Sequence, residues 1–152
     1  MTLLESLMIR WATPEDVTLL TDLSHMTVLE KYPDIIGADK VESYVASGAV
    51  RKYYTERNEF CRVAELDGEA VGVSATKHNT IDLMMVTLAR HRSGIGSALL
   101  ADAEALLFTD NEKLQLDSFR DNAQANTFYA KHGWNLDHYF DDADFGIPMV
   151  RI

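Results

Sequence analysis

Alternation between apolar and polar residues predicts seven short strands in this chain. They cover residues 8–12, 60–66, 70–75, 80–88, 114–118, 134–139 and 147–152. Asp67-Gly68 joins the second strand to the third, and this dipeptide is typical of a tight hairpin turn. The segment 80–88 (TIDLMMVTL) is more apolar than the others, which predicts a central position in the sheet.

Apolar residues at helical spacing predict four helices. The first follows Thr13-Pro14-Glu15-Asp16, where Thr13 is expected to cap the helix and Asp16 to complete a capping box. The second begins at Ala38-Asp39, and Gly133 ends the fourth. The residues expected to face the core are Val17, Leu19, Leu20 and Leu23 in the first helix, Val41, Tyr44, Val45, Tyr53 and Tyr54 in the second, Leu99, Ala103, Leu106 and Leu107 in the third (97–108), and Ala125, Phe128 and Tyr129 in the fourth (122–132).

The predicted order is β, α, α, β, β, β, α, β, α, β, β. No linker, repeat or low-complexity tract interrupts it, so one domain over residues 1–152 is expected. Helices and strands are mixed along the chain, which indicates an α/β protein with a mixed sheet of six to seven strands and about four flanking helices.

Charge and composition narrow the classes of function. The net charge is −10, from 14 basic and 24 acidic residues, and argues against a nucleic-acid partner. No apolar run reaches the roughly 18 residues that a membrane span needs. The single cysteine, Cys61, and an N-terminus without a basic leader predict a reducing, cytoplasmic location. The histidines and the cysteine lack paired ligand spacing, so no metal site is predicted.

Gly94-Ile95-Gly96 lies between the predicted strand 80–88 and the helix that follows. Amides in the first turn of a helix have no intrahelical acceptors, and the helix dipole adds partial positive charge there. Arg90 and Arg92 add cations, so the turn predicts a phosphate or pyrophosphate site. An ordinary glycine turn with surface arginines is the alternative. Ser97-Ala98 after Gly96 excludes a P-loop, and Leu99 in place of a third glycine excludes a Rossmann fingerprint.

Four sequence blocks resemble the GCN5-related N-acetyltransferase (GNAT) superfamily. HRSGIG, residues 91–96, is similar to its Arg/Gln-x-x-Gly-x-Gly/Ala motif, with His91 at the Arg/Gln position. NAQANTFYAKHGW, residues 122–134, is similar to its Asn-x-x-Ala-x-x-Phe-Tyr-x-Lys-x-Gly-Phe motif. IRWATPEDVTLLTDL and AELDGEAVGV resemble its first strand and helix and its hairpin. Together the blocks extend over nearly the whole chain and imply the GNAT acyl-CoA N-acyltransferase fold.

The resemblance implies acetyl-CoA as the cofactor. Its pyrophosphate would be held at His91, Arg92, Ser93, Gly94, Ile95, Gly96 and Ser97, and its pantetheine arm would pair with Met84, Met85 and Val86. A backbone N–H near residues 84–86 would polarise the thioester carbonyl. Asn122 and Tyr129 would contact the cofactor, with Tyr129 as the proton donor to the leaving thiolate. The residues alone also allow another interpretation, in which Asn122 is a helix N-cap and Tyr129 is a core residue.

The sequence leaves open which residue is the general base. Asp82 is one candidate, because regular alternation places it on one strand face with Thr80 and Met84, and the family often carries an acid on this strand. His78 is a second candidate because histidine titrates near neutral pH. Asp117 is a weaker third. Each of these side chains could instead be solvent-exposed or ion-paired.

The resemblance places the acceptor near the first helices and the late hairpin. The residues nominated there are His25, Glu30, Tyr32, Tyr139, Asp141, Asp142 and Asp144. The expected activity is acetyl transfer to a primary amine of a small molecule or peptide by direct attack in a ternary complex. Cys61, far in sequence from the glycine turn, gives no support for an acyl-enzyme. The alternative is a non-catalytic acyl-CoA-binding or regulatory domain. A homodimer is expected from the resemblance alone, and an acyl group longer than acetyl stays open.

Overall fold

A computed structural model describes residues 6–87, 93–143 and 146–152. The chain divides into two compact units, residues 1–114 and 115–152, and each is described separately. His91 and Arg92 of the predicted phosphate site, Leu88, Arg90 and the acceptor candidate Asp144 lie outside the described residues.

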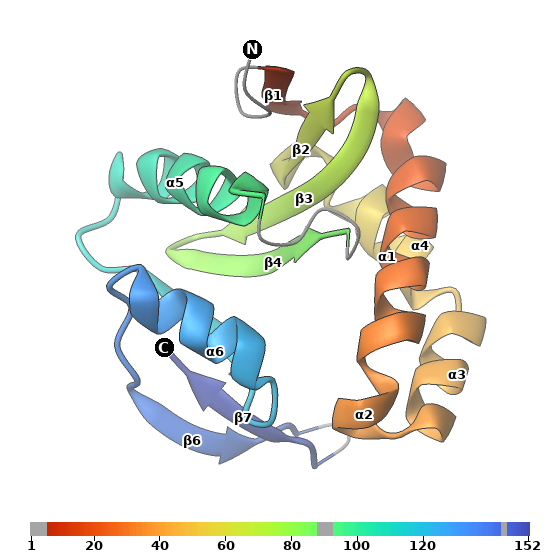
Figure 1. The fold of residues 1–152 in the computed structure, drawn as a ribbon, viewed down its shortest axis with the longest axis vertical. Coiled ribbons are helices and arrows are strands. Elements are labelled where there is room, and N and C mark those ends of the chain that lie inside the picture. Colours follow the sequence, from red (N-terminus) through yellow and green to blue (C-terminus); the bar gives the residue numbers. More distant parts are fainter. Residues whose placement is uncertain (1–5, 88–92, 144–145) are drawn as a thin grey trace. The chain divides into compact units, whose positions relative to one another are not determined.

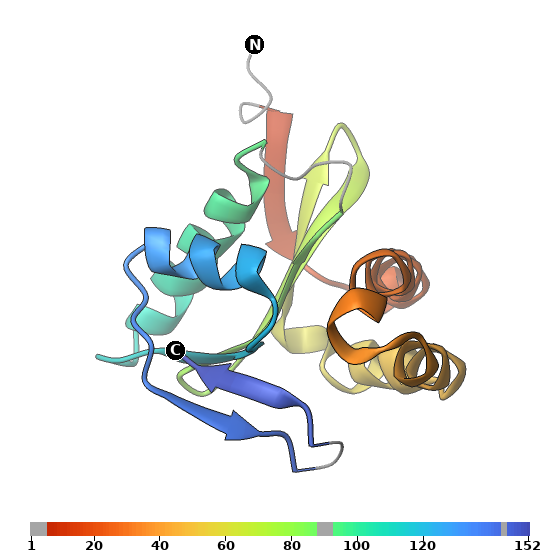
Figure 2. The same ribbon diagram turned by 60° about the horizontal axis from the view of Figure 1, so that its bottom comes forward.

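The first unit is an antiparallel sheet with helices on both faces. Its strands are β1 (Leu7–Trp11), β2 (Cys61–Leu66), β3 (Glu69–Lys77) and β4 (Thr80–Val86), paired in that order. Its helices are α1 (Val17–Lys31), α2 (Pro33–Ile36), α3 (Ala38–Ala46), α4 (Ala49–Glu56) and α5 (Ile95–Phe108), with 3-10 turns at Pro14–Asp16 and Asn58–Phe60. Figures 1 and 2 show α5 on one face of these strands and α1, α3 and α4 on the other.

Local signals in the sequence account for the turns of this unit. Asp67 and Gly68 both have positive φ, 52° and 82°, as the predicted hairpin turn between β2 and β3 requires. The Thr13 N–H donates to Asp16 Oδ2 at 2.7 Å, so the Asp16 half of the predicted capping box forms. The same carboxylate accepts two hydrogen bonds from Arg10 of β1, at 2.8 and 2.9 Å, which tie the first strand to the start of α1.

Each face of the sheet has its own apolar core. On the side of α1, α3 and α4, buried residues include Leu20, Val41, Tyr54, Val63 and Val73. On the other side, Ile95 and Leu99 of α5 pack against Ala64, Leu66 and Val71. Gly72 of β3 allows α5 to approach closely, because a Cβ there would lie 2.8 Å from Leu99 Cδ1.

Two β-bulges interrupt the ladder. Ala64 pairs with Gly72 and Glu65 pairs with Ala70, which leaves Val71 as an extra residue of β3. Ala75 pairs with Leu83 and Thr76 pairs with Ile81, which leaves Asp82 as an extra residue of β4. A bulge changes which face of the sheet the flanking side chains occupy, so both positions depart from simple alternation.

The second unit contains β5 (Gln115–Phe119), α6 (Ala123–Lys131), β6 (His138–Asp141) and β7 (Pro148–Arg151). β7 pairs antiparallel with β5 on one side and with β6 on the other. Asn122 caps α6, since its Oδ1 accepts from the Ala125 N–H at 3.3 Å. Gly133, with φ of 90°, follows the end of α6 as predicted.

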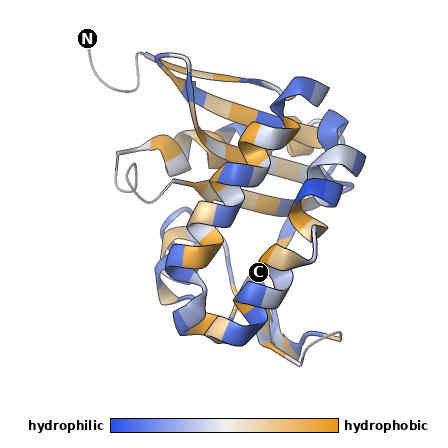
Figure 3. Cartoon of the chain, turned by 90° about the vertical axis from the view of Figure 1, so that its right-hand side faces the viewer, coloured by the Kyte–Doolittle hydropathy of each residue, from blue (hydrophilic) through white to orange (hydrophobic). Residues whose placement is uncertain are grey.

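The structure corrects several expected element bounds. The predicted second helix is divided into α3 and α4 at Gly48, whose φ of 77° is left-handed, and the short α2 precedes them, so the described residues form six α-helices where about four were expected. The predicted strand 134–139 begins only at His138. Leu19 and Tyr44, expected in the core, are 47% and 42% exposed. Figure 3 shows hydrophilic and hydrophobic residues interspersed along the helices on this side of the sheet, α1, α3 and α4.

Candidate functional site

The glycine turn forms the N-terminus of α5. Gly94 is the N-cap in the left-handed conformation, with φ of 88°, and the Ala98 N–H donates to its carbonyl at 3.1 Å. The amides of residues 95–97 therefore precede this first bond of the helix. Ile95 is fully buried and anchors the turn, whereas Gly96 is partly exposed and Ser97 exposed. The segment from Ser93 to Ser97 therefore contains the N-cap and the first turn of α5, whose amides have no acceptor within the helix.

β4 leads toward this turn and presents different side chains to the two faces of the sheet. Met85 is 7% exposed and packs with the core beside α1 and α4. Met84 and Val86 pack instead against the cluster that contains Ile95 and Leu99 of α5. The strand is paired with β3 along one edge, with Met84 opposite Ser74. Met85 is therefore a core residue, whereas Met84 and Val86 are partly buried against the core on the α5 side.

Asp82 does not share a face with Met84, and that prediction is wrong. The Tyr53 hydroxyl of α4 donates to Asp82 Oδ2 at 2.6 Å, which places the carboxylate on the α4 side of the sheet. The physical reason is the bulge, which inserts Asp82 as an extra residue and reverses the alternation on one side of it. Sequence analysis assigned Tyr53 only to an apolar helix face and missed this contact.

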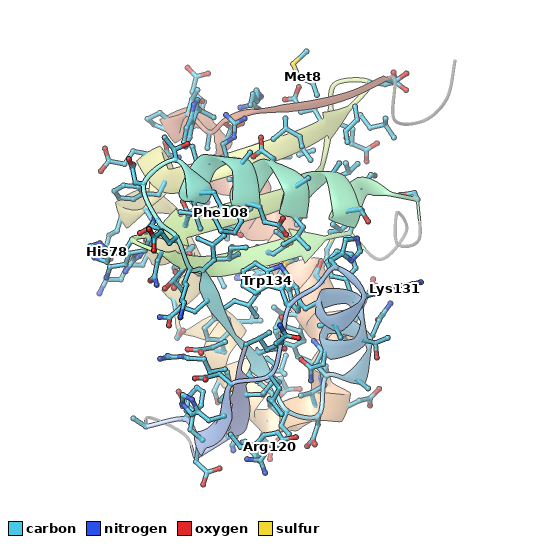
Figure 4. All side chains as sticks on the ribbon, turned by 90° about the vertical axis from the view of Figure 1, so that its left-hand side faces the viewer. Met8, His78, Phe108, Arg120, Lys131 and Trp134 are labelled. Atoms are coloured by element: carbon cyan, nitrogen blue, oxygen red, sulfur yellow. The ribbon has the colours of Figure 1, made fainter. Side chains whose placement is uncertain are left out.

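His78 lies in the turn between β3 and β4, with φ of 56° and an exposed side chain. Its carbonyl accepts a hydrogen bond from Asn111 Nδ2 at 3.3 Å. Figure 4 shows the ring projecting outward from this turn. The turn precedes β4, whereas the glycine turn follows it, so His78 and Gly94 belong to opposite ends of the strand.

In the second unit, the predicted cofactor residues lie at the start and on the buried face of α6. Asn122 is 8% exposed and occupied as the helix cap described above. Tyr129 is 9% exposed, and its ring centroid lies 5.4 Å from that of Phe128 and 6.2 Å from that of Trp134. Asp117 accepts two hydrogen bonds from Arg151, at 2.8 and 3.0 Å, and is therefore engaged in an ion pair.

The acceptor candidates differ in their surroundings. Burial raises the pKa of Tyr32, and the neighbouring Tyr44 adds to this effect. His25 Nε2 is buried without a hydrogen-bond partner among the described residues. Tyr139 is 57% exposed, with the Arg120 guanidinium 4.4 Å from its ring centroid. Glu30, Asp141 and Asp142 lie at the end of α1, in β6 and just after it.

Cys61 is unsuited to nucleophilic chemistry. It is fully buried at the start of β2, and its thiol donates to the Arg57 carbonyl at 3.3 Å. Burial raises the pKa of the Cys61 thiol to about 11, so it is protonated at neutral pH.

The described residues offer neither a metal site nor a membrane-spanning helix. Within residues 6–87, 93–143 and 146–152, no group of three or more histidine, cysteine or acidic side chains has the geometry to hold a metal ion. In the same part of the chain, no helix is long and apolar enough to cross a membrane.

The sequence matches the family model for the acetyltransferase (GNAT) domain over residues 21–150. The chain therefore belongs to the GNAT acetyltransferase family, whose members use acetyl-CoA, and the family predicted from the four sequence blocks is confirmed. Such an enzyme requires an acceptor substrate for the acetyl group. A search of curated protein sequences gives no match.

Solved structures show the same fold. Apo YjaB from Escherichia coli is 20% identical, with a TM-score of 0.79 over 95% of each chain. PaiA N-acetyltransferase from Thermoplasma acidophilum, solved in complex with coenzyme A, is 18% identical, with a TM-score of 0.79 over 96% of this chain and 98% of its own. A GCN5-related N-acetyltransferase from Rhodopseudomonas palustris is 19% identical, with a TM-score of 0.82 over 95% of this chain and 92% of its own. The predicted mixed α/β class and GNAT fold are confirmed.

Proposed function

We propose that this protein transfers an acetyl group from acetyl-CoA to a primary amine of a small molecule or peptide, by direct attack in a ternary complex. The observation that carries the proposal is the left-handed glycine cap of α5, within a chain that belongs to the GNAT acetyltransferase family. Direct attack is favoured because the one cysteine is buried and protonated.

The residues at the start of α5 fit the diphosphate of coenzyme A. The amides of Ser93–Ser97 would donate to the phosphate oxygens, and Gly94 brings no Cβ to the point where its backbone turns. His91 and Arg92 are proposed to contribute side chains to the same contact. Met84, Met85 and Val86 are proposed to pair through their main chain with the pantetheine arm. The bound cofactor supplies a thioester as the acyl donor.

Two side chains are proposed to move protons. Asp82 would take the proton that the attacking amine loses, and Tyr129 would donate its hydroxyl proton to the departing sulfur. Asn122 is proposed to contact the cofactor arm through the part of its amide that does not cap α6. His78 stays a secondary candidate for the base. A backbone N–H near Met84 to Val86 is proposed to stabilise the developing oxyanion.

The second candidate function is a non-catalytic acyl-CoA-binding or regulatory domain. One observation favours it: His91 stands where the family motif has arginine or glutamine. A cytoplasmic location and a homodimer also belong to the proposal. The buried reduced cysteine supports the former, and the resemblance to the family supports the latter.

The test is thiol release from acetyl-CoA across a panel of amines, together with the change in melting temperature that acetyl-CoA causes. A ligand that binds only the native state raises the melting temperature. Stabilisation without thiol release would favour the binding domain, and no stabilisation at saturating acetyl-CoA would reject both functions.

Tyr129→Phe tests the proposed proton donor. The variant is expected to lower kcat by roughly 10²-fold or more, the typical contribution of a general acid, with little change in acetyl-CoA affinity. Tyr44→Phe, at an exposed tyrosine of α3, is the matched control and should leave both unchanged. A collapse of affinity in Tyr129→Phe would assign this residue a structural role.

A further inference from the structure

One hydroxyl group, from α4, holds the carboxylate of Asp82. Tyr53 donates to Oδ2 at 2.6 Å, and among the described residues no second hydrogen bond or ion pair reaches this carboxylate. Asp82 is also the extra residue of the bulge in β4, so the backbone itself turns its side chain toward α4. The carboxylate is thus fixed at one oxygen and has the other available.

The donor is held in one state and one orientation. Burial raises the pKa of Tyr53, and the hydrogen bond to Asp82 raises it further, so the hydroxyl stays protonated at neutral pH. The Tyr53 ring meets that of Tyr54 edge-on, with centroids 5.4 Å apart. The guanidinium of Arg57, the residue after α4, lies 5.8 Å from the Tyr53 ring centroid.

Cys61 of β2 is a neighbouring titratable group that interacts electrostatically with Asp82, and its thiol is protonated and neutral. Arg57, the residue after α4, lies beside both Tyr53 and Cys61: its guanidinium is over the Tyr53 ring, and its carbonyl accepts a hydrogen bond from the Cys61 thiol. Within the described part of the first unit, Tyr53 is therefore the group that fixes the orientation of the Asp82 carboxylate.

We propose that Tyr53 is a positioning residue. Its hydroxyl holds the Asp82 carboxylate in one orientation, in which one carboxylate oxygen is left for the acceptor amine. This inference rests on the proposed function. The Tyr53 hydroxyl engages one carboxylate oxygen, so the other oxygen is directed to the amine, whose proton it accepts during attack. Tyr53 itself does not touch the reacting atoms.

The experiment compares the wild-type chain with Tyr53→Phe, Asp82→Asn and the double variant. Thiol release gives kcat and KM for the amine and for acetyl-CoA, and the side-chain ¹³C chemical shift of the Asp82 carboxyl group, measured without ligand at one neutral pH, reports its hydrogen bond. Tyr54→Phe is the matched control, because this neighbouring hydroxyl bonds to Ser24 at 2.5 Å and not to Asp82.

Tyr53→Phe is expected to lower kcat/KM at neutral pH by about three- to tenfold. This is less than a buried hydrogen bond to a charged group contributes, because this pair is exposed. Loss of the donor should change the ¹³C shift of the Asp82 carboxyl group and leave the KM of acetyl-CoA unchanged, because the cofactor does not contact this pair in the proposed site. Tyr54→Phe should change neither the ¹³C shift nor kcat/KM. In the Asp82→Asn background, Tyr53→Phe should have no further effect on kcat/KM.

The inference is overturned if Tyr53→Phe leaves kcat/KM for the amine unchanged, if it leaves the ¹³C shift of the Asp82 carboxyl group unchanged, or if it retains its full effect in the Asp82→Asn background. If the wild-type chain releases no thiol with any amine, the proposed function fails and the inference fails with it. The ¹³C shift of the Asp82 carboxyl group identifies that case, since it would still report the Tyr53–Asp82 hydrogen bond in an inactive protein.

Discussion

Gly72 is the position where the packing of α5 on the sheet leaves least room for a side chain. In Gly72→Ala, the new Cβ would lie 2.8 Å from Leu99 Cδ1, 3.1 Å from the Met85 carbonyl oxygen and 3.5 Å from Val86 Cγ2. Leu99 is fully buried, so its methyl group cannot move into solvent, and the Met85 oxygen belongs to the neighbouring strand. Relief therefore requires α5 or β4 to shift.

The expected loss of stability follows from two opposing effects. Overpacking in a dense core costs about 1–3 kcal/mol, and two close contacts, one with a backbone oxygen, put Gly72→Ala in the upper part of this range, at about 2–3 kcal/mol. Replacing glycine by alanine recovers about 0.4–1 kcal/mol by restricting the unfolded chain. The net loss is about 1–2.6 kcal/mol, which corresponds to a melting temperature lower by roughly 2–10 °C in a chain of this length. Urea unfolding followed by circular dichroism measures the loss directly.

A double-mutant cycle identifies the cause. Leu99→Ala removes the nearest clashing methyl group, so Gly72→Ala should cost at least about 1 kcal/mol less in that background than in the wild type. Ser74→Ala is the control on the same strand: Ser74 is fully buried and its hydroxyl has no partner among the described residues, so this change should be neutral or stabilising. A neutral Gly72→Ala, or an equal cost in both backgrounds, would refute the steric argument.

Two further predictions concern charge. The Arg10 guanidinium lowers the pKa of Asp16 from 3.8 to about 2, so its stabilisation of about 2 kcal/mol is present above pH 4 and lost as pH falls toward 2. Asp16→Asn should therefore be destabilised in urea at pH 6 and approach the wild type near pH 2, whereas the exposed Asp22→Asn should differ little throughout. Gly94→Asp should weaken coenzyme A binding by about tenfold or more, through backbone strain and repulsion of the diphosphate. Gly48→Asp, at another left-handed helix cap, carries the same strain and should leave affinity unchanged; equal effects of the two would contradict the phosphate assignment.

The parts of the fold that sequence analysis predicted well are those fixed by local chemistry. Asp67-Gly68 requires positive φ at both residues, and Asn122 and Gly133 carry the cap and stop signals of α6. The division of the second helix was missed because Ser47-Gly48 lies within a continuous apolar pattern. Leu19 and Tyr44 were misplaced because hydrophobicity alone does not reveal which face of a helix finds a partner.

The candidate site shows the same division between local and long-range information. The glycine turn and the family motifs could be recognised from the sequence because their residues are contiguous. The bulge at Asp82 was not, because an extra residue becomes visible only once the register with β3 is known. Tyr53 lies 29 residues from Asp82 in the chain, so their hydrogen bond depends on how α4 packs on the sheet.

The burial of Cys61 gives the molecule an internal reporter. Its thiol is the only one in the chain, is fully covered in the native core and is held protonated there. Alkylating reagents should consequently label it only during transient opening of the core beneath α4, at a rate set by the frequency of those openings. A bound ligand that slows labelling would show that its binding energy is transmitted to this part of the sheet.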